Sequence, residues 1–324
     1  MLNILDVLFV GMAFVATFTG ILINSFEKYV PVFIIKGYKY GSFAYRGSGA
    51  DFVQLLEIPK SYYKHFYSFS SIFSAVTMFY MFLVYYLNFG MMTYIPAALK
   101  LMLHNDEPSV PATAAFIAMS LLTIQCIRRF YETHYMQVFA KSSKINISHY
   151  IVGMLHYFGC VVAIVGEAPL FCGSQNRDSM MWSNTQTSLY SVPCILLFLW
   201  AWFEQFQTNI IFANMRKDKR SGEVITEDHG VPHGRLFDIV SSPHRLCEVI
   251  MYTVLIILIP TKTFFCIYLW VLVSERCKTH YFQSPPNLLS INTTIQTAVQ
   301  AHNWYKRTFK KYPENRVAII PGLL

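Results

Sequence analysis

The sequence predicts an all-α membrane protein: a polytopic bundle of seven transmembrane helices followed by a cytosolic C-terminal cap. Composition is the first reason, because the 324 residues are 54% hydrophobic and only 14% charged, which is typical of chains embedded in lipid. The second is the length of the apolar runs, which suits helices that cross a bilayer and lacks the alternation of barrel strands. The third is the uneven placement of Lys and Arg along the chain.

The expected spans follow the apolar runs in order, beginning with the first residues of the chain. That first run lacks a basic leading region and a small-residue cleavage site, so we interpret it as a retained span rather than a signal peptide. Pro260 separates the last two runs, each of which is short. The seven expected spans, all within a single integral-membrane domain 1–324, are residues 4–23, 66–88, 110–127, 148–168, 189–212, 246–259 and 263–277.

The distribution of basic residues favours seven spans over six. With seven spans, the segments 24–64, 128–147, 213–245 and 274–324 lie on one side and hold 23 of the 26 Lys and Arg residues. Joining the last two spans would move the C-terminal segment across and leave 16 basic residues against 10. Because basic residues accumulate on the cytosolic side, the sequence predicts an external N-terminus and a cytosolic C-terminus.

Polar residues occur at the cytosolic ends of the third, fifth and sixth spans, although ionisable groups at membrane depth are costly. Such groups normally face a bundle interior or a wet cavity. Gln205, Asn209 and Arg216 are spaced four and seven residues apart, so one helix face presents all three. His244 and Glu248 form an i,i+4 pair in the same way. These side chains suit phosphates, sugar hydroxyls and an amide, so we expect a phosphorylated nucleotide, bound without a GxGxxG or P-loop motif.

The C-terminal segment 278–324 is basic, is interrupted by proline and is too polar to span a membrane. Its aromatic and cationic side chains are therefore expected to form a cap over an anionic ligand. No metal is expected, because the Gly and Pro residues between His229, His233 and His244 indicate a loop rather than a coordinating cluster. We also expect no nucleic-acid partner.

Several short motifs follow one another in a recognisable order and spacing. They are PKSYYKHFY at 59–67, RRFYE at 128–132, NMRK at 214–217, FDIVSSPH at 237–244 with Glu248, and a closing stretch with HNWY at 302–305, YP at 312–313, Arg316 and IP at 320–321. On these motifs the chain, from about residue 58 to the C-terminus, resembles the steroid 5α-reductase family, and most closely its polyprenol (polyprenal) reductase branch.

The resemblance implies a seven-helix protein of the endoplasmic reticulum membrane that binds NADPH in a cytosol-facing cavity. Where the family has Asn before the Glu of span six, this chain has His244, and a steroid-branch Tyr in span three is replaced near Cys126. The second departure argues against a steroid substrate. The resemblance implies that the family's cofactor contacts carry over by position onto Arg129, Gln205, Asn209, Arg216, Glu248, Tyr305 and Arg316. We include His244 among the expected contacts, because it stands at the position of the family's Asn.

Hydride transfer from a nicotinamide requires an electron-poor carbon, which the isolated alkene of an allylic alcohol does not offer. A double bond conjugated to a carbonyl does, because the negative charge moves to oxygen. The expected substrate is therefore a long-chain polyprenal, reduced to dolichal in dolichol synthesis for protein N-glycosylation. A donor must stabilise the oxyanion. Candidates are a protonated Glu57, Tyr62 and His65, and Glu57 aligns with the carbonyl-facing Glu of the steroid branch. His302 occupies the family's tail histidine position, so Glu57 and His302 are the expected catalytic residues.

Three other functions stay open on the sequence. A Δ4-steroid 5α-reductase would be separated from a polyprenal reductase by product analysis with both substrates. A membrane methyltransferase with a related helical cap would bind S-adenosylmethionine in place of NADPH. A non-enzymatic lipid carrier would bind neither cofactor and would tolerate loss of Arg216.

Overall fold

The computed structural model describes residues 3–38, 49, 51–92, 94–104, 107–139, 143–172, 185–218, 221, 223–226, 230–277, 313 and 316. Two of the expected site residues, His302 and Tyr305, lie outside these described residues. The same holds for the expected cap, of which positions 313 and 316 alone are described.

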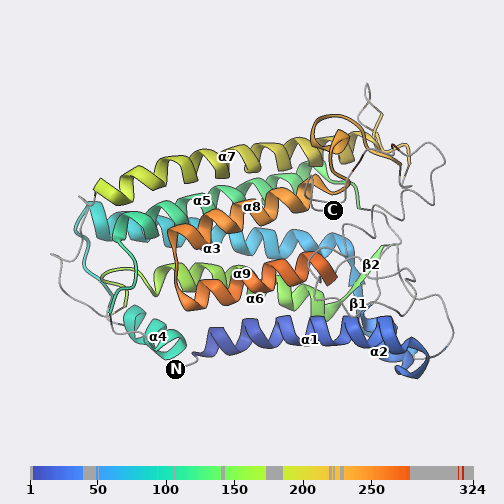
Figure 1. The fold of residues 1–324 in the computed structure, drawn as a ribbon, viewed down its shortest axis with the longest axis horizontal. Coiled ribbons are helices and arrows are strands. Elements are labelled where there is room, and N and C mark those ends of the chain that lie inside the picture. Colours follow the sequence, from blue (N-terminus) through green and yellow to red (C-terminus); the bar gives the residue numbers. More distant parts are fainter. Residues whose placement is uncertain are drawn as a thin grey trace.

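Seven long helices correspond to the seven apolar runs, and Figure 1 shows them lying side by side with alternating direction. They are α1 (Ile4–Phe26), α3 (Tyr63–Tyr86), α5 (Ala112–Tyr131), α6 (Ile147–Val165), α7 (Thr185–Asn214), α8 (Pro243–Leu258) and α9 (Lys262–Cys277). The main packing partners are α1 with α9, α7 with α8, and α3 with both α5 and α6. The fold is therefore mostly helical, as the composition predicted.

Five of these helices are long and apolar enough to cross a membrane: α1, α3, α5, α6 and α7. The other two, α8 and α9, have 16 residues each. At 1.5 Å per residue such a helix is about 24 Å long, which is shorter than a typical hydrocarbon core. The structure thus supports five candidate spans, and the two remaining helices pack within the same bundle (Figure 1).

Short elements that the sequence did not predict join the long helices. A two-stranded antiparallel ladder pairs β1 (Glu57–Pro59) with β2 (Lys144–Asn146), so the fold is not purely helical. Helix α4 (Tyr94–Leu103) lies in a region expected to be a loop, and its Leu103 packs against Gly166 at the end of α6. Another short helix, α2 (Val32–Tyr38), follows α1. Segments this short carry too few residues for a period to be seen in the sequence.

The described helix ends and strands that flank three of the basic segments lie at one end of the bundle. Figure 1 shows α2, β1, β2 and the ends of α5 and α7 at that end, which we call the polar end. Helix α4 and the N-terminus lie at the other end. The alternating connections agree with the expected grouping of the segments 24–64, 128–147 and 213–245.

The opposite end carries a small buried polar group, which we call the N-terminal corner. Asn3 caps α1 by accepting a hydrogen bond from the backbone N–H of Asp6 at 2.7 Å, and Asp6 closes a capping box. The Asp6 carboxylate accepts from Thr263 Oγ1 at 2.9 Å and pairs with Lys262 Nζ at 3.1 Å. Asn3 Nδ2 also donates to Thr263 Oγ1 at 2.7 Å, so the corner ties α1 to α9.

Candidate functional site

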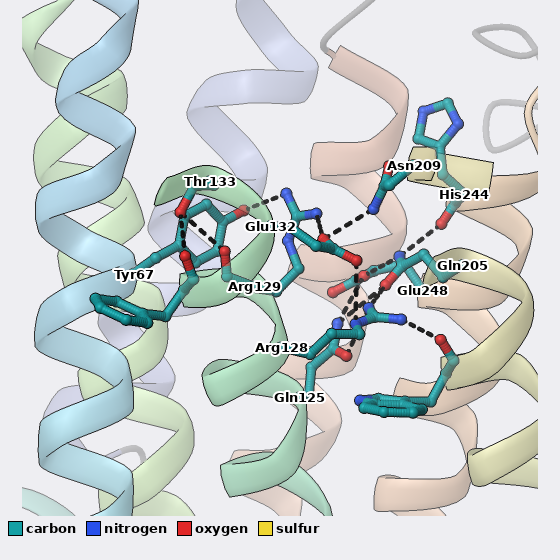
Figure 2. Close-up of polar contacts among 12 residues, drawn as sticks. Tyr67, Gln125, Arg128, Arg129, Glu132, Thr133, Gln205, Asn209, His244 and Glu248 are labelled. Carbon is teal, nitrogen blue, oxygen red and sulfur yellow. Dashed lines mark hydrogen bonds and ion pairs between the residues drawn. The ribbon is translucent and has the colours of Figure 1, made fainter. Parts of the chain in front are cut away.

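Seven polar side chains from three helices converge toward the polar end of the bundle, as Figure 2 shows. We call this group the polar layer. Most of its members are buried, although they lie among apolar helices. It consists of Gln125, Arg128 and Arg129 on α5, Glu132 directly after α5, Gln205 and Asn209 on α7, and Glu248 on α8.

The sequence of α5 explains how three members of the layer share one face. Gln125, Arg128 and Glu132 are spaced three and four residues apart, so they project from the same side of a helix. At Glu132 the helix widens into a π-helical turn, in which the N–H of Gln137 donates to the Glu132 carbonyl oxygen at 2.8 Å. Such turns are rare and recur at functional sites.

Arg128 is the central cation of the layer and is 4% exposed. Its Nη2 donates to Gln125 Oε1 at 2.7 Å, and it also donates to the side chain of Gln205 and to the backbone carbonyl of Trp202. Its Nε lies 3.4 Å from Glu132 Oε1. The guanidinium stacks over the indole ring of Trp202 at 5.2 Å. Arg128 therefore links α5 to α7 through both its hydrogen bonds and the stacking of its flat guanidinium on Trp202.

Gln205 on α7 connects α5 and α7 to α8. Its Nε2 donates to the backbone carbonyl of His244 at 2.8 Å and to Glu248 Oε2 at 2.5 Å. Gln125 Nε2 donates to Gln205 Oε1 at 3.1 Å and to the same Glu248 oxygen at 3.4 Å. A single carboxylate thus accepts from amides on two different helices.

Arg129 extends the layer toward α3. Its Nη2 donates to the Tyr67 hydroxyl at 3.0 Å, its guanidinium stacks over the Tyr67 ring at 4.8 Å, and it pairs with Glu132. Asn209 Nδ2 donates to the same Glu132 carboxylate at 2.9 Å. The structure therefore brings together four residues expected from the sequence: Arg129, Gln205, Asn209 and Glu248.

Other expected residues lie elsewhere at the polar end. The ring of His244 points away from the layer and packs edge-on against Phe212, so His244 enters the layer through its carbonyl (Figure 2). Arg216, beyond the end of α7, donates from Nη1 to the Val138 carbonyl at 3.1 Å. Arg316 is 3% exposed, and its Nη2 lies 3.0 Å from His233 Nδ1.

The expected catalytic Glu57 lies in the strand ladder. It is directly opposite Asn146 in the register, and its Oε2 is 3.6 Å from Lys144 Nζ. About a third of its side chain is exposed. None of the contacts that the structure gives for Glu57 reaches the polar layer.

Another ion pair fixes the loop that leads into α8. Glu204 on α7 accepts from Arg235 at 3.1 Å and 2.5 Å, and these hydrogen bonds to Glu204 raise the pKa of the Arg235 guanidinium. Arg235 has a φ of 53° and follows Gly234, whose φ is 92°. Asp238 accepts from the N–H of Gly234 at 2.8 Å. These contacts hold the loop against the end of α7.

Four residues of the site were missed by the sequence analysis as site members: Tyr67, Gln125, Arg128 and Glu132. A signal for the last three was present, because polar residues three and four apart inside an apolar span predict a buried polar face. Tyr67 gave no such signal, since an interfacial aromatic belt explains it equally well.

The charges of the polar layer cancel, with two Arg residues facing two Glu residues. Arg128 Nε and Glu132 Oε1 are nevertheless buried and make no hydrogen bond with any described residue. The layer presents amide and carboxylate groups of both donor and acceptor type in an apolar setting. Chemically it suits recognition of a neutral polar group such as a carboxamide, with more cations nearby at Arg216 and Arg316.

Comparison with known proteins places the chain in a family. A profile of the family described as 3-oxo-5-alpha-steroid 4-dehydrogenase matches residues 173–284 and 286–324. Polyprenal reductase of Drosophila melanogaster is 35% identical over 334 residues, covering 100% of this chain and 94% of that protein. Polyprenal reductases of Caenorhabditis elegans and Homo sapiens are 28% and 24% identical; they cover 88% and 82% of this chain, and 85% and 78% of their own lengths. The chain therefore belongs to the steroid 5-alpha-reductase family, in its polyprenal reductase branch.

Proposed function

We propose that the protein is an oxidoreductase that reduces the α,β-unsaturated double bond of polyprenal, giving dolichal for dolichol synthesis and protein N-glycosylation. The observation that carries this proposal is the match to a polyprenal reductase over the whole chain. The apolar bundle supports it, because the isoprenoid tail stays in lipid while the head group reaches the protein interior. Substrate and bilayer are therefore the proposed partners.

NADPH is the proposed cofactor, and the residues of the polar end fit it. The amide and carboxylate groups of Gln205, Asn209 and Glu248 suit a carboxamide, and Arg216 and Arg316 suit phosphates, since a guanidinium binds phosphate bidentately. Arg129, His244 and Tyr305 complete the proposed contacts. When bound, the reduced nicotinamide supplies a hydride to the β-carbon of the substrate.

The proposed setting is the endoplasmic reticulum membrane, crossed seven times, with the C-terminal cap in the cytosol. The basic segments at the polar end support this orientation. Helices α8 and α9 are short for a span, but buried residues such as Leu255, Leu258 and Ile267 show that their neighbours cover them. Glycosylation-site insertion into the segments 87–111 and 213–245 tests this topology. The first is expected to be modified and the second unmodified.

The cofactor proposal is tested with Arg216→Ala in protein reconstituted in lipid with NADPH and polyprenal. Loss of one charged hydrogen-bonding partner is worth about 1.5–3 kcal/mol, so the KM for NADPH should rise by roughly 10- to 100-fold. The preference for NADPH over NADH should narrow as well. Lys217→Ala is the matched control, since it removes the neighbouring cation. Unchanged kinetics in Arg216→Ala would remove Arg216 from the site.

The substrate proposal is tested by mass spectrometry of the products formed from polyprenal, polyprenol and testosterone in parallel. A saturated product from polyprenal alone supports the proposal. Reduction of testosterone would instead support the activity named in the family description, 3-oxo-5-alpha-steroid 4-dehydrogenase.

Glu57 is proposed as an acid that stabilises the developing oxyanion, and His302 is proposed to orient the nicotinamide or to supply the proton. Glu57→Gln should lower turnover at least tenfold with little change in the KM for NADPH, because general acids typically contribute that much or more. Lys144→Gln is the matched control, since it breaks the same ion pair and leaves the carboxyl group in place. Equal activity in Glu57→Gln and Lys144→Gln would show that Glu57 serves the strand ladder alone.

A further inference from the structure

Two polar side chains, His156 and Tyr252, form a pair inside the bundle between α6 and α8, outside the contacts of the polar layer. His156 Nε2 lies 2.6 Å from the Tyr252 hydroxyl oxygen. Tyr252 is 2% exposed, whereas His156 is partly exposed along α6. The Cys160 sulfur lies 3.8 Å from His156 Nε2 and 3.9 Å from the Tyr252 oxygen.

Two lines of side chains lead from the polar layer to this pair. On α8, Tyr252 is four residues after Glu248 and therefore one turn further into the bundle. On the other side, Tyr67 packs edge-on against Tyr157 at 5.8 Å, and Tyr157 packs against His156 at 5.1 Å. His156 and Tyr252 are thus the next polar side chains along these two lines, and Tyr252 lies one helix turn beyond the proposed cofactor contact Glu248.

The surroundings of the pair are apolar and closely packed. The ring of Phe9 on α1 meets His156 edge-on at 6.3 Å. A Cβ atom at Gly159 would lie 2.5 Å from that same ring, and one at Gly153 would lie 3.1 Å from the ring of Phe66. Phe9 on α1 therefore flanks His156, and Phe66 on α3 lies against Gly153 of the same helix as His156. Such walls suit an isoprenoid chain, and a phenol and an imidazole in this setting are costly unless they are hydrogen-bonded, as this pair is.

We propose that the Tyr252 hydroxyl donates a hydrogen bond that stabilises the substrate's aldehyde oxygen during reduction, in addition to the donor proposed at Glu57, and that His156 positions the hydroxyl. This inference rests on the proposed function. Hydride adds to the β-carbon, the electrons of the C=C bond shift toward the carbonyl, and the oxygen becomes an enolate anion. A proton, which His302 is proposed to supply, then adds to the α-carbon and restores the C=O bond. With His156 protonated on Nε2, the imidazole donates to the Tyr252 oxygen, and the Tyr252 O–H points to the substrate.

Other phenols of the described bundle are less suited to this role. Tyr85 donates its hydroxyl hydrogen to the Pro169 carbonyl at 3.0 Å. The Tyr268 hydroxyl already shares a contact of 2.9 Å with Thr253 Oγ1 on α8. Tyr67 accepts from Arg129 and already belongs to the polar layer. Tyr252 combines burial, a neighbouring imidazole and a position one turn from Glu248.

The test compares Tyr252→Phe with wild type in full-length protein reconstituted in lipid with NADPH and polyprenal. Removing one oxyanion donor lowers kcat by about 10²- to 10³-fold, and the KM for NADPH should stay within about twofold. Deuterium at the transferred position of NADPH should give a larger isotope effect in the variant, because hydride transfer becomes fully rate-limiting. Tyr85→Phe, which removes a buried hydroxyl outside the proposed site, should keep kcat near wild type.

His156 is tested separately as a positioning residue. His156→Leu should lower kcat at least tenfold, and His156→Gln, which keeps a donor, should recover part of it; a packing role would not distinguish the two. Near-wild-type kcat in Tyr252→Phe overturns the proposal, as does equal kcat in His156→Leu and His156→Gln. If Tyr252→Phe does not fold, the comparison of kcat between His156→Leu and His156→Gln decides whether the proposal stands. Inactive wild-type protein would instead refute the proposed function itself.

Discussion

The N-terminal corner and the polar layer each bury a carboxylate in the same bundle, but they satisfy it differently. In the corner, Asp6 is fully buried and takes its partners from Asn3 beside it and from two consecutive residues of α9, Lys262 and Thr263. Lys262 is 56% exposed, so one side of the corner reaches the surface. The group is compact and joins two helix ends.

In the polar layer, the carboxylates of Glu132 and Glu248 take partners from α5 and α7, far apart in the sequence. The layer contains more cations and amides than a helix cap needs, and two of its buried polar atoms make no hydrogen bond with any described residue. The difference teaches that burial of charge alone does not mark a site. Convergence of cations, amides and carboxylates from separate helices is what sets the polar layer apart from the corner.

The largest expected effect that separates the two regions is on the stability of the polar layer. Arg128→Ala removes one of the two cations paired with Glu132, and it also removes the hydrogen bonds from Arg128 to Gln125 and Gln205. Removing one partner of a buried ion pair typically destabilises by about 3–5 kcal/mol. Thermal unfolding of the detergent-solubilised protein, monitored by fluorescence, should show a markedly lower midpoint.

Arg128→Lys is the control for this variant, because it keeps the charge and loses the second guanidinium contact. The unfolding midpoint of Arg128→Lys should lie between those of wild type and Arg128→Ala. If Arg128→Ala lowered the unfolding midpoint no more than Lys262→Ala does, this result would contradict the central role of Arg128.

A smaller effect is expected in the corner. Asp6→Asn keeps an acceptor for Thr263 and removes the charge that pairs with Lys262. Hydrogen bonds to charged groups contribute about 1.5–3 kcal/mol and neutral ones about 1 kcal/mol, so a loss of about 1–2 kcal/mol in stability follows. The KM for NADPH should not change. A raised KM would show that the two ends of the bundle are coupled.

The smallest effect is expected from Lys262→Ala, because exposed ion pairs contribute at most about 1 kcal/mol. The unfolding midpoint should fall slightly at low salt and not at all in high salt, where the pair is screened. A large, salt-independent loss would mean that Lys262 packs through its alkyl chain rather than through its charge.

The sequence predicted the seven long helices well, because apolar runs and proline positions carry that information locally. It also predicted four members of the polar layer, since Gln205 and Asn209 share a helix face and Arg129 and Glu248 lie in family motifs. It did not single out Arg128 beside Arg129. Adjacent helical residues point about 100° apart, and only the packing of α5 against α7 and α3 decides which partners each of the two Arg side chains reaches. The pairing of Glu57 with Lys144 was equally hidden, because it joins segments distant along the chain.

The close approach of Phe9 to Gly159 constrains how this protein can diverge. The aromatic ring occupies the volume where a methyl group at position 159 would stand, so neither position can change freely while the other is kept. Substitutions at these two positions should therefore accumulate as compensating pairs among relatives. A larger residue on α6 would be accompanied by a smaller one on α1, and the spacing of the two helices would be preserved.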